Sequence, residues 1–194
     1  MIKSNLPFYL ASKSPRRRKL LKQIGLKFRS FSVDLNEEIL DGEHPAQTVK
    51  RLASHKSAEA VKKIKSGIVI TADTIVVLDH EIIGKPKNGK EAVKILSRLS
   101  GRTHTVYTGF VVNNITKGKK AVDFEKTDVT FRKLTPKEIR EYVKSGSPMD
   151  KAGAYGIQDD FGAVFVEKVD GCYYNVVGLP LSKLYKALLE IIKI

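Results

Sequence analysis

The sequence lacks the features of several classes of protein. Its 194 residues include one cysteine, Cys172, which excludes an internal disulfide framework and fits a reducing compartment. It has no tryptophan, and its few aromatic residues do not alternate with basic residues as a surface that stacks single-stranded nucleic acid requires. Asp73 interrupts the apolar run from Ile68 to Leu78, and no charged segment followed by an apolar one opens the chain. We therefore expect a cytoplasmic protein without a membrane span.

Common catalytic and nucleotide-binding motifs are also missing. Zinc-ligand spacing is absent from the four histidines, which are His44, His55, His80 and His104, and a single cysteine cannot form a CxxC pair. The chain has no GxxxxGK[ST] loop, no GxGxxG after a strand-like run and no GxSxG elbow. These absences argue against a structural zinc site, a P-loop enzyme and an α/β-hydrolase.

Positive charge is plentiful. Lys and Arg number 35 against 21 Asp and Glu, which gives a net charge of +14. Such a surplus favours anionic partners, which include nucleotides, nucleic acids and acidic membrane surfaces. Lysines occur in nearly every segment, so part of the surplus is also consistent with a solubilising surface. The 42% apolar content is typical of a globular protein, and we expect a single domain over residues 1–194 with room for two lobes.

Strand-like and helix-like segments alternate along the chain, which predicts an α/β fold. Strand-like runs lie at Phe8–Ala11, Phe28–Val33, Ile68–Leu78, Thr105–Val112, Val122–Phe131 and Ala163–Val166. Helix starts are predicted at Ser14-Pro15, Asn88 and Thr135, about Pro45, and after Pro180. The runs 105–112 and 122–131 are typical of an antiparallel hairpin, so we expect a mixed sheet.

The segment Leu10–Arg18 breaks a local rule. Ser14 and Pro15 favour a helix start, but Arg16, Arg17 and Arg18 crowd the positive end of the helix dipole. A bound polyanion would resolve this conflict, because free N–H groups, serine hydroxyls and guanidinium groups converge there. The alternative is a solvated basic turn.

Two further charges interrupt apolar patterns. Lys56 lies on the helical face formed by Val49, Leu52, Ala53 and Ala60, either as a lysine that extends to water or at the edge of an anion site. Asp73 interrupts an Ile- and Val-rich run. It is expected either to meet a cation, a metal or a cleft, or to cap a turn at the end of a strand.

Three loops carry further candidates. Glu37 and Glu38 lie in a polar segment, where surface exposure is the default. Gly84-Lys85-Pro86 predicts a tight turn that aims Lys85. The glycine-bearing segment 150–158 can approach a ligand closely, and the amide of Gln158 could read the edge of a nucleobase.

Taken together, these motifs resemble the Maf family of nucleoside triphosphate pyrophosphatases. The resemblance is carried by Ala11 to Arg17, Ala72-Asp73-Thr74, Gly84-Lys85-Pro86, Ser100-Gly101 with His104 and Thr108-Gly109, Asp150 to Gln158, and Asn175 to Pro180. It runs nearly end to end. The segments Gly-Ala-Tyr-Gly-Ile-Gln and Asn-Val-Val-Gly-Leu-Pro are similar to those of the subgroup that hydrolyses dTTP and UTP.

The resemblance implies an elongated mixed β-sheet flanked by helices, with a substrate cleft between two lobes, as in inosine triphosphatase-like proteins. It also implies a divalent metal, Mg²⁺ or Mn²⁺, and a homodimer. By position, the family pattern makes Asp73 the catalytic proton acceptor. It assigns substrate specificity to Arg16, Thr74 and Gln158, phosphate binding to Ser12, Arg17, Lys56 and Lys85, and metal binding to Glu37 and Asp73.

The predicted function is hydrolysis of dTTP and UTP, and of modified pyrimidine nucleotides as a further candidate group, to the monophosphate and pyrophosphate. Water would attack the α-phosphorus with the assistance of a metal ion. The expected partners are a pyrimidine nucleoside triphosphate and a second copy of the chain, with neither a membrane nor a nucleic acid among them. The alternative is a non-catalytic basic module that binds nucleic acid or a division protein. The net charge supports that alternative, and the missing stacking aromatics count against it.

Overall fold

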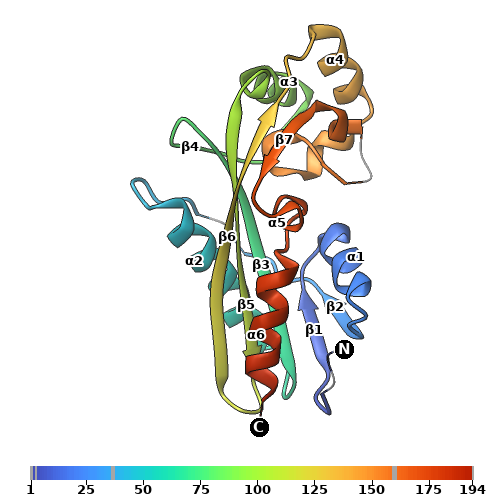
Figure 1. Cartoon of the computed structure of the whole chain (residues 1–194). Coiled ribbons are helices and arrows are strands. Elements are labelled where there is room, and N and C mark those ends of the chain that lie inside the picture. The colour runs from blue at the N-terminus through green and yellow to red at the C-terminus, as the bar shows by residue number, and fades with distance from the viewer. Residues whose placement is uncertain (1, 3, 36–37, 159–160, 194) are drawn as a thin grey trace. The chain divides into compact units, whose positions relative to one another are not determined.

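The computed structural model describes residues 2, 4–35, 38–158 and 161–193, and in them the chain forms a mixed seven-stranded sheet flanked by helices (Figure 1). The strand order is β2-β1-β3-β5-β6-β7, and β4 pairs with β3. The strands are β1 (Phe8–Ala11), β2 (Phe28–Phe31), β3 (Ile68–Leu78), β4 (Glu81–Ile83), β5 (Thr103–Asn114), β6 (Lys119–Phe131) and β7 (Val166–Asp170).

Both strand directions occur in this sheet, as predicted. β1 is parallel to β2 and to β3, whereas β4 is antiparallel to β3 and β7 is antiparallel to β6. Side-chain contacts between β5 and β6 indicate an antiparallel pair. Thr103 Oγ1 lies 2.8 Å from Thr130 Oγ1, and two residues along the strands Thr105 Oγ1 donates to Asp128 Oδ1 at 2.7 Å. The mixed α/β fold and the hairpin are therefore confirmed.

The chain divides into two compact units, and strands β3, β5 and β6 contribute residues to both. The first unit comprises residues 1–73, 108–125 and 178–194, and the second comprises residues 74–107 and 126–177. The first unit holds helices α1 (Pro15–Gln23), α2 (Pro45–Val61) and α6 (Leu181–Ile192). The second unit holds helices α3 (Gly89–Leu99), α4 (Pro136–Lys144) and α5 (Tyr173–Val177).

In the first unit, α2 and α6 cover opposite faces of β5. An added Cβ on Gly109 would lie 2.4 Å from the carbonyl oxygen of Val49, so only glycine allows α2 to pack this closely. Asn113 Nδ2 donates to Ser57 Oγ on the same helix at 3.4 Å. The next residue, Asn114, points the other way, and its Nδ2 donates to the carbonyl of Ile191 in α6 at 3.3 Å.

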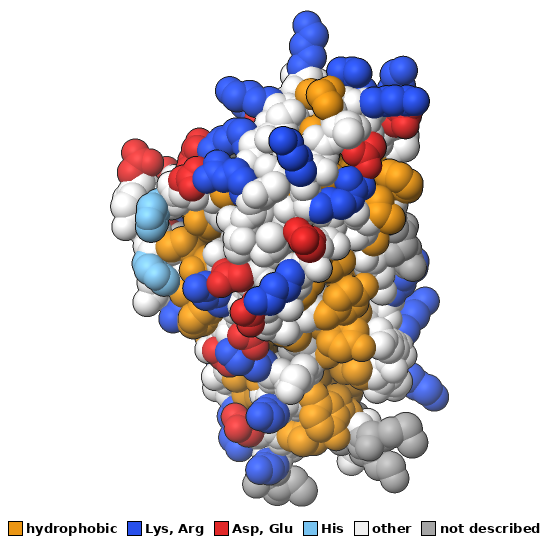
Figure 2. All heavy atoms as spheres, turned by 45° about the horizontal axis from the view of Figure 1, so that its top comes forward, with side chains coloured by type: hydrophobic (Ala, Val, Ile, Leu, Met, Phe, Trp, Pro, Cys, Tyr) orange, Lys and Arg blue, Asp and Glu red, His pale blue; other side chains and the backbone are white. Residues whose placement is uncertain are grey.

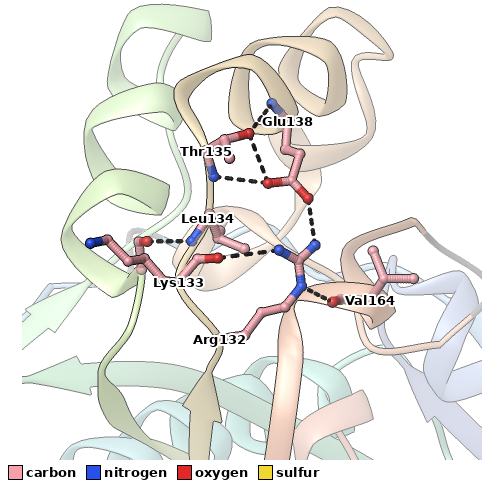
Figure 3. Close-up of polar contacts among 7 residues, drawn as sticks. Arg132, Lys133, Leu134, Thr135, Glu138 and Val164 are labelled. Atoms are coloured by element: carbon pink, nitrogen blue, oxygen red, sulfur yellow. Dashed lines mark hydrogen bonds and ion pairs between the residues drawn. The ribbon is translucent and has the colours of Figure 1, made fainter.

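In the second unit, a polar network fixes the start of α4 (Figure 3). Thr135 and Glu138 form the predicted capping box, and Arg132 Nη2 donates to Glu138 Oε1 at 2.6 Å. Arg132 Nε also donates to the carbonyl of Val164 at 2.8 Å, which ties the end of β6 to the segment before β7. The bond from Arg132, together with bonds from Thr135, lowers the pKa of Glu138 to about 2.

Most of the predicted elements are confirmed, and one is wrong. The helix starts at Ser14-Pro15, Asn88 and Thr135 and the helices at Pro45 and after Pro180 are present. The strand predicted at Ala163–Val166 is instead a 3-10 helix over Phe161–Phe165, with β7 beginning at Val166. The rings of Phe161 and Phe165 lie 6.0 Å apart, a contact between residues four apart that an extended strand cannot make.

Among the described residues, no helix combines the length and the apolar character needed to cross a membrane.

Candidate functional site

Asp73 lies in the middle of β3 and is buried. Thr71 and Asp73 are two residues apart and so share one face of the strand, and both contact α2. Thr71 Oγ1 donates to the carbonyl of Ala53 at 2.7 Å, which fixes the helix against the strand. The carboxylate of Asp73 accepts a hydrogen bond from the ammonium of Lys56. The side chains of Lys56 and Asp73 are only 13% and 8% exposed.

This ion pair explains both interruptions of the apolar patterns. Lys56 belongs to the buried face of α2, but its ammonium contacts Asp73 and does not extend to water. The expectation of a lysine that extends to water is therefore wrong. Asp73 meets a cation, as one of the two interpretations predicted, and it does not cap a turn because β3 continues to Leu78. A buried carboxylate beside an ammonium can accept a proton or hold a cation.

The arginine segment begins α1 as predicted, but its members lie in different surroundings. Ser14 caps the helix, with its side chain accepting from the backbone N–H of Arg17 at 3.4 Å. Arg16 is partly exposed, whereas Arg17 is buried at 9% exposure. Arg17 Nη1 lies 3.5 Å from Ser12 Oγ, so the structure brings together two of the predicted phosphate-binding residues.

The guanidinium of Arg17 is bonded to the main chain. Its Nε donates to the carbonyl of Gly178 and its Nη1 donates to the carbonyl of Ala72, both at 2.8 Å. These acceptors satisfy part of the positive charge that the sequence places at the start of α1. Carbonyl groups of the chain therefore take part of the role that was expected of a bound polyanion.

In the second unit, the loops that carry Lys85 and Gln158 are connected. The backbone N–H of Gly153 donates to the carbonyl of Gly84 at 3.2 Å, so segment 150–158 is bonded to the segment Gly84-Lys85-Pro86. Lys85 is exposed, as a residue that meets an anion in solution must be. Thr74 follows Asp73 in β3, and its side chain lies on the opposite face of the strand.

Gln158 carries an acceptor with unmet hydrogen-bonding capacity. Its Oε1 atom is shielded from solvent, and no donor among the described residues reaches it. A buried acceptor without a partner costs free energy, so such an atom in a loop is a candidate for contact with a ligand N–H. This observation fits the prediction that the Gln158 amide reads the edge of a base.

A buried histidine that is not among the predicted site residues supports the same loop. His104 on β5 is 1% exposed, and its Nε2 lies 2.8 Å from the hydroxyl of Tyr155. The ring of Phe131 packs edge-on against both residues. Burial lowers the pKa of His104 to about 4 and raises that of Tyr155, so both side chains are neutral at pH 7. Only the position of His104 within a family motif pointed to it in the sequence.

The described residues offer few metal ligands. They contain no group of three or more His, Cys, Asp and Glu side chains placed to hold an ion. Asp73 is one of the two predicted ligands, and the other, Glu37, lies outside the described residues. Mg²⁺ is commonly held by one or two carboxylates together with substrate phosphates and water, and a single buried carboxylate fits that kind of site.

Comparison with known proteins supports one family. The model of the family described as Maf-like protein matches residues 7–191. A dTTP/UTP pyrophosphatase from Syntrophomonas wolfei is 46% identical over 176 residues, which cover 91% of this chain and 93% of that protein. A dTTP/UTP pyrophosphatase from Clostridium perfringens is 47% identical over 181 residues, with 92% and 94% covered. A third protein of that name, from a Thermoanaerobacter species, is 48% identical over 180 residues, with 92% and 93% covered.

Structural comparison gives a protein of similar fold. A HAM1 protein from Coxiella burnetii superimposes with a TM-score of 0.51 over 95% of this chain and 99% of that chain. The two sequences are 13% identical, so the likeness shows a shared fold alone. The family model and the relatives above 45% identity carry the assignment, and they confirm the resemblance seen in the motifs: the chain belongs to the Maf family.

Proposed function

We propose that this chain is a nucleoside triphosphate pyrophosphatase that hydrolyses dTTP and UTP to the monophosphate and pyrophosphate. The observation that carries the proposal is the identity of 46–48% over more than nine-tenths of the chain with proteins named dTTP/UTP pyrophosphatase. The buried carboxylate of Asp73 and the shielded acceptor of Gln158 supply two groups that such a reaction needs.

The reaction is attack of water on the α-phosphorus. A bond forms between the water oxygen and this phosphorus, the bond from it to the bridging oxygen breaks, and pyrophosphate leaves with the bonding electrons. Asp73 accepts the proton that the water releases. Its position on a strand, with small neighbours and with α2 fixed behind it, keeps the carboxylate in a defined place.

Cationic side chains balance the charge of the triphosphate. Arg16, Lys56 and Lys85 supply this charge, and Ser12 adds a hydroxyl donor. The guanidinium of Arg17, the fourth predicted cation, donates to the carbonyls of Gly178 and Ala72. Lys56 donates to Asp73, and a phosphate oxygen would compete with the carboxylate for its ammonium. Binding of the triphosphate thus weakens the hold of Lys56 on Asp73 and leaves the carboxylate freer to accept a proton.

A divalent cation is part of the proposal. Asp73, together with Glu37 and substrate oxygens, would hold Mg²⁺ or Mn²⁺. When bound, the ion supplies positive charge that polarises the reacting phosphate. The requirement is checked by adding EDTA and then restoring either metal, with loss and recovery of turnover as the expected result.

Base recognition is assigned to Gln158, with Arg16 and Thr74 as further specificity residues. Uracil and thymine share an N3–H donor and an O4 acceptor, and an amide side chain presents the complementary acceptor and donor. The Oε1 atom, which no donor among the described residues reaches, would accept from N3–H. Cytosine presents the reverse pattern, so the preference for dTTP and UTP follows.

The charge distribution favours an enzyme over a nucleic-acid-binding module. On the face shown in Figure 2, Lys and Arg side chains are spread among Asp and Glu side chains and do not form one continuous patch. Several of the surface cations are paired with carboxylates, for example Arg102 with Asp79 at 2.6 Å and Lys62 with Glu59 at 2.5 Å. The homodimer and the cytoplasmic location stay predictions, and sedimentation of the purified chain tests the first.

Release of pyrophosphate from each common nucleoside triphosphate, in the presence of Mg²⁺ or Mn²⁺, tests the proposed function. We expect kcat/KM to be highest for dTTP and UTP. Hydrolysis in ¹⁸O-water should place the label in the monophosphate, since attack is on the α-phosphorus. Absence of turnover with all triphosphates, or label found in pyrophosphate alone, would overturn the proposal.

A further inference from the structure

Arg17 is placed to hold the main chain next to Asp73. Its side chain is buried in the first unit, on the same helix as the fully buried Leu20 and Leu21. Two of its nitrogen atoms donate hydrogen bonds of 2.8 Å, and both acceptors are backbone carbonyls. The acceptors, Ala72 and Gly178, lie 55 and 161 residues away in the sequence.

The Ala72 carbonyl lies on the side of β3 that faces β1, just beyond the point where the pairing of these two strands ends. Ile68 N donates to the carbonyl of Pro7 at 2.9 Å, so Ile68, and every second residue after it, turns its backbone polar groups toward β1. The paired register of β1 and β3 ends at Leu10 and Ile70. Two residues further along β3, the Ala72 carbonyl accepts from Arg17 Nη1 where a β1 amide would otherwise lie.

The second acceptor, Gly178, lies between α5 and α6. Gly178 has a φ of +118°, a conformation that L side chains rarely adopt, and its carbonyl accepts from Arg17 Nε. One planar guanidinium thus joins the start of α1, the peptide that precedes Asp73 and the residue shortly before α6. A lysine ammonium on a flexible stem cannot hold two carbonyls in the same fixed directions.

We propose that Arg17 is a positioning residue, which fixes the peptide between Ala72 and Asp73 and so keeps the Asp73 carboxylate in its reactive place. The proposal rests on the proposed function, since it concerns the residue that accepts the proton there. In this proposal Arg17 has a different role from Arg16, which is partly exposed and suited to contact the substrate itself. A carboxylate displaced by about 1 Å is expected to cost roughly 10²-fold in rate.

Steady-state kinetics of Arg17→Lys and Arg17→Ala with dTTP test the proposal. Lys22→Ala is the matched control, because it removes an exposed cation from the same helix. We expect both Arg17 variants to lose roughly 10²-fold in kcat, with KM changed by less than about threefold and with no rescue by lysine. If Arg17 acted mainly by binding phosphate, KM would rise in Arg17→Ala and lysine would restore most of the loss; that result would overturn the proposal.

Hydrogen exchange without nucleotide tests the same proposal independently of activity. Arg17→Lys should speed exchange of amides in residues 70–76 and 175–181, and Lys22→Ala should not. Unchanged exchange in these segments would overturn the positioning role, as would a uniform rise over the chain with normal kcat. If the unaltered protein hydrolyses no triphosphate, the proposed function fails, while the exchange result still decides whether Arg17 holds these two segments.

Discussion

Lys56 on α2 and Asp73 on β3 form a buried ion pair inside the first unit, although 17 residues separate them in the sequence. Each of the two side chains would be costly to bury alone, because a buried charge without a partner loses its hydration. The pair therefore links the packing of α2 on the sheet to Asp73, the residue assigned to accept a proton.

Replacing Lys56 by methionine should leave the Asp73 carboxylate buried and uncompensated. We expect Lys56→Met to lower the free energy of unfolding by on the order of 3 kcal/mol and to abolish most activity. Lys62→Met is the control, since Lys62 pairs with Glu59 near the end of the same helix while its own side chain is 67% exposed. Urea unfolding measures both variants, and equal small effects would show that the Lys56 pair is not energetically important.

Replacing Gln158 by glutamate should erode the choice of base. A carboxylate keeps an acceptor but has no N–H₂ group to donate to O4 of uracil or thymine. Loss of one such contact is worth about 1–3 kcal/mol, so the ratio of kcat/KM for UTP to that for CTP should fall by roughly 5- to 150-fold. UTP and CTP carry the same triphosphate group, so a change in phosphate binding affects both and cancels in the ratio. An unchanged ratio would contradict base reading by Gln158.

His104 should make stability depend on pH below neutrality. The pKa of His104 falls from its ordinary value of 6.5 to about 4 in the folded protein, because the ring is buried. Between these pH values the unfolded chain binds the proton more tightly. This contribution, on the order of 3 kcal/mol, is therefore present above pH 6.5 and is lost as the pH falls toward 4.

Urea unfolding of the unaltered protein and of His104→Gln at pH 7 and pH 4.5 measures this contribution. The variant should lose less unfolding free energy than the unaltered protein over this interval. Carboxylates titrate in both proteins, so the difference between the two losses reports on residue 104. Equal losses would mean that His104 is protonated in the folded protein as readily as in the unfolded chain.

Local rules predicted much of the fold from the sequence. Ser14 with Pro15, and Thr135 with Glu138, are helix starts whose contacts lie within four residues, so their pattern is visible in the sequence. The strand predicted at Ala163–Val166 is wrong, because a short apolar run fits a strand and a single helical turn equally well. Its aromatic contact decides between them, and that contact is seen only in the folded chain.

The site was predictable in its residues and less so in its contacts. Lys56 and Asp73 each stood out as a charge in an apolar pattern, but their pairing depends on how α2 lies on β3. The contacts of Arg17 could not be foreseen, since its acceptors are carbonyl groups that every residue carries. For His104, burial and the bond to Tyr155 come from tertiary packing alone.

The kcat of Asp73→Asn with saturating dTTP and metal tests the central claim most directly, with Asp128→Asn as the control. Asp128 is also a strand aspartate, and it accepts a hydrogen bond from Thr105. Asparagine keeps the size of Asp73 but cannot accept the proton from water. We expect kcat to fall by roughly 10²- to 10⁴-fold in folded Asp73→Asn, with KM changed only a few-fold and with Asp128→Asn close to the unaltered protein. A folded Asp73→Asn protein that turns over dTTP at a near-normal rate would show that Asp73 is not the base.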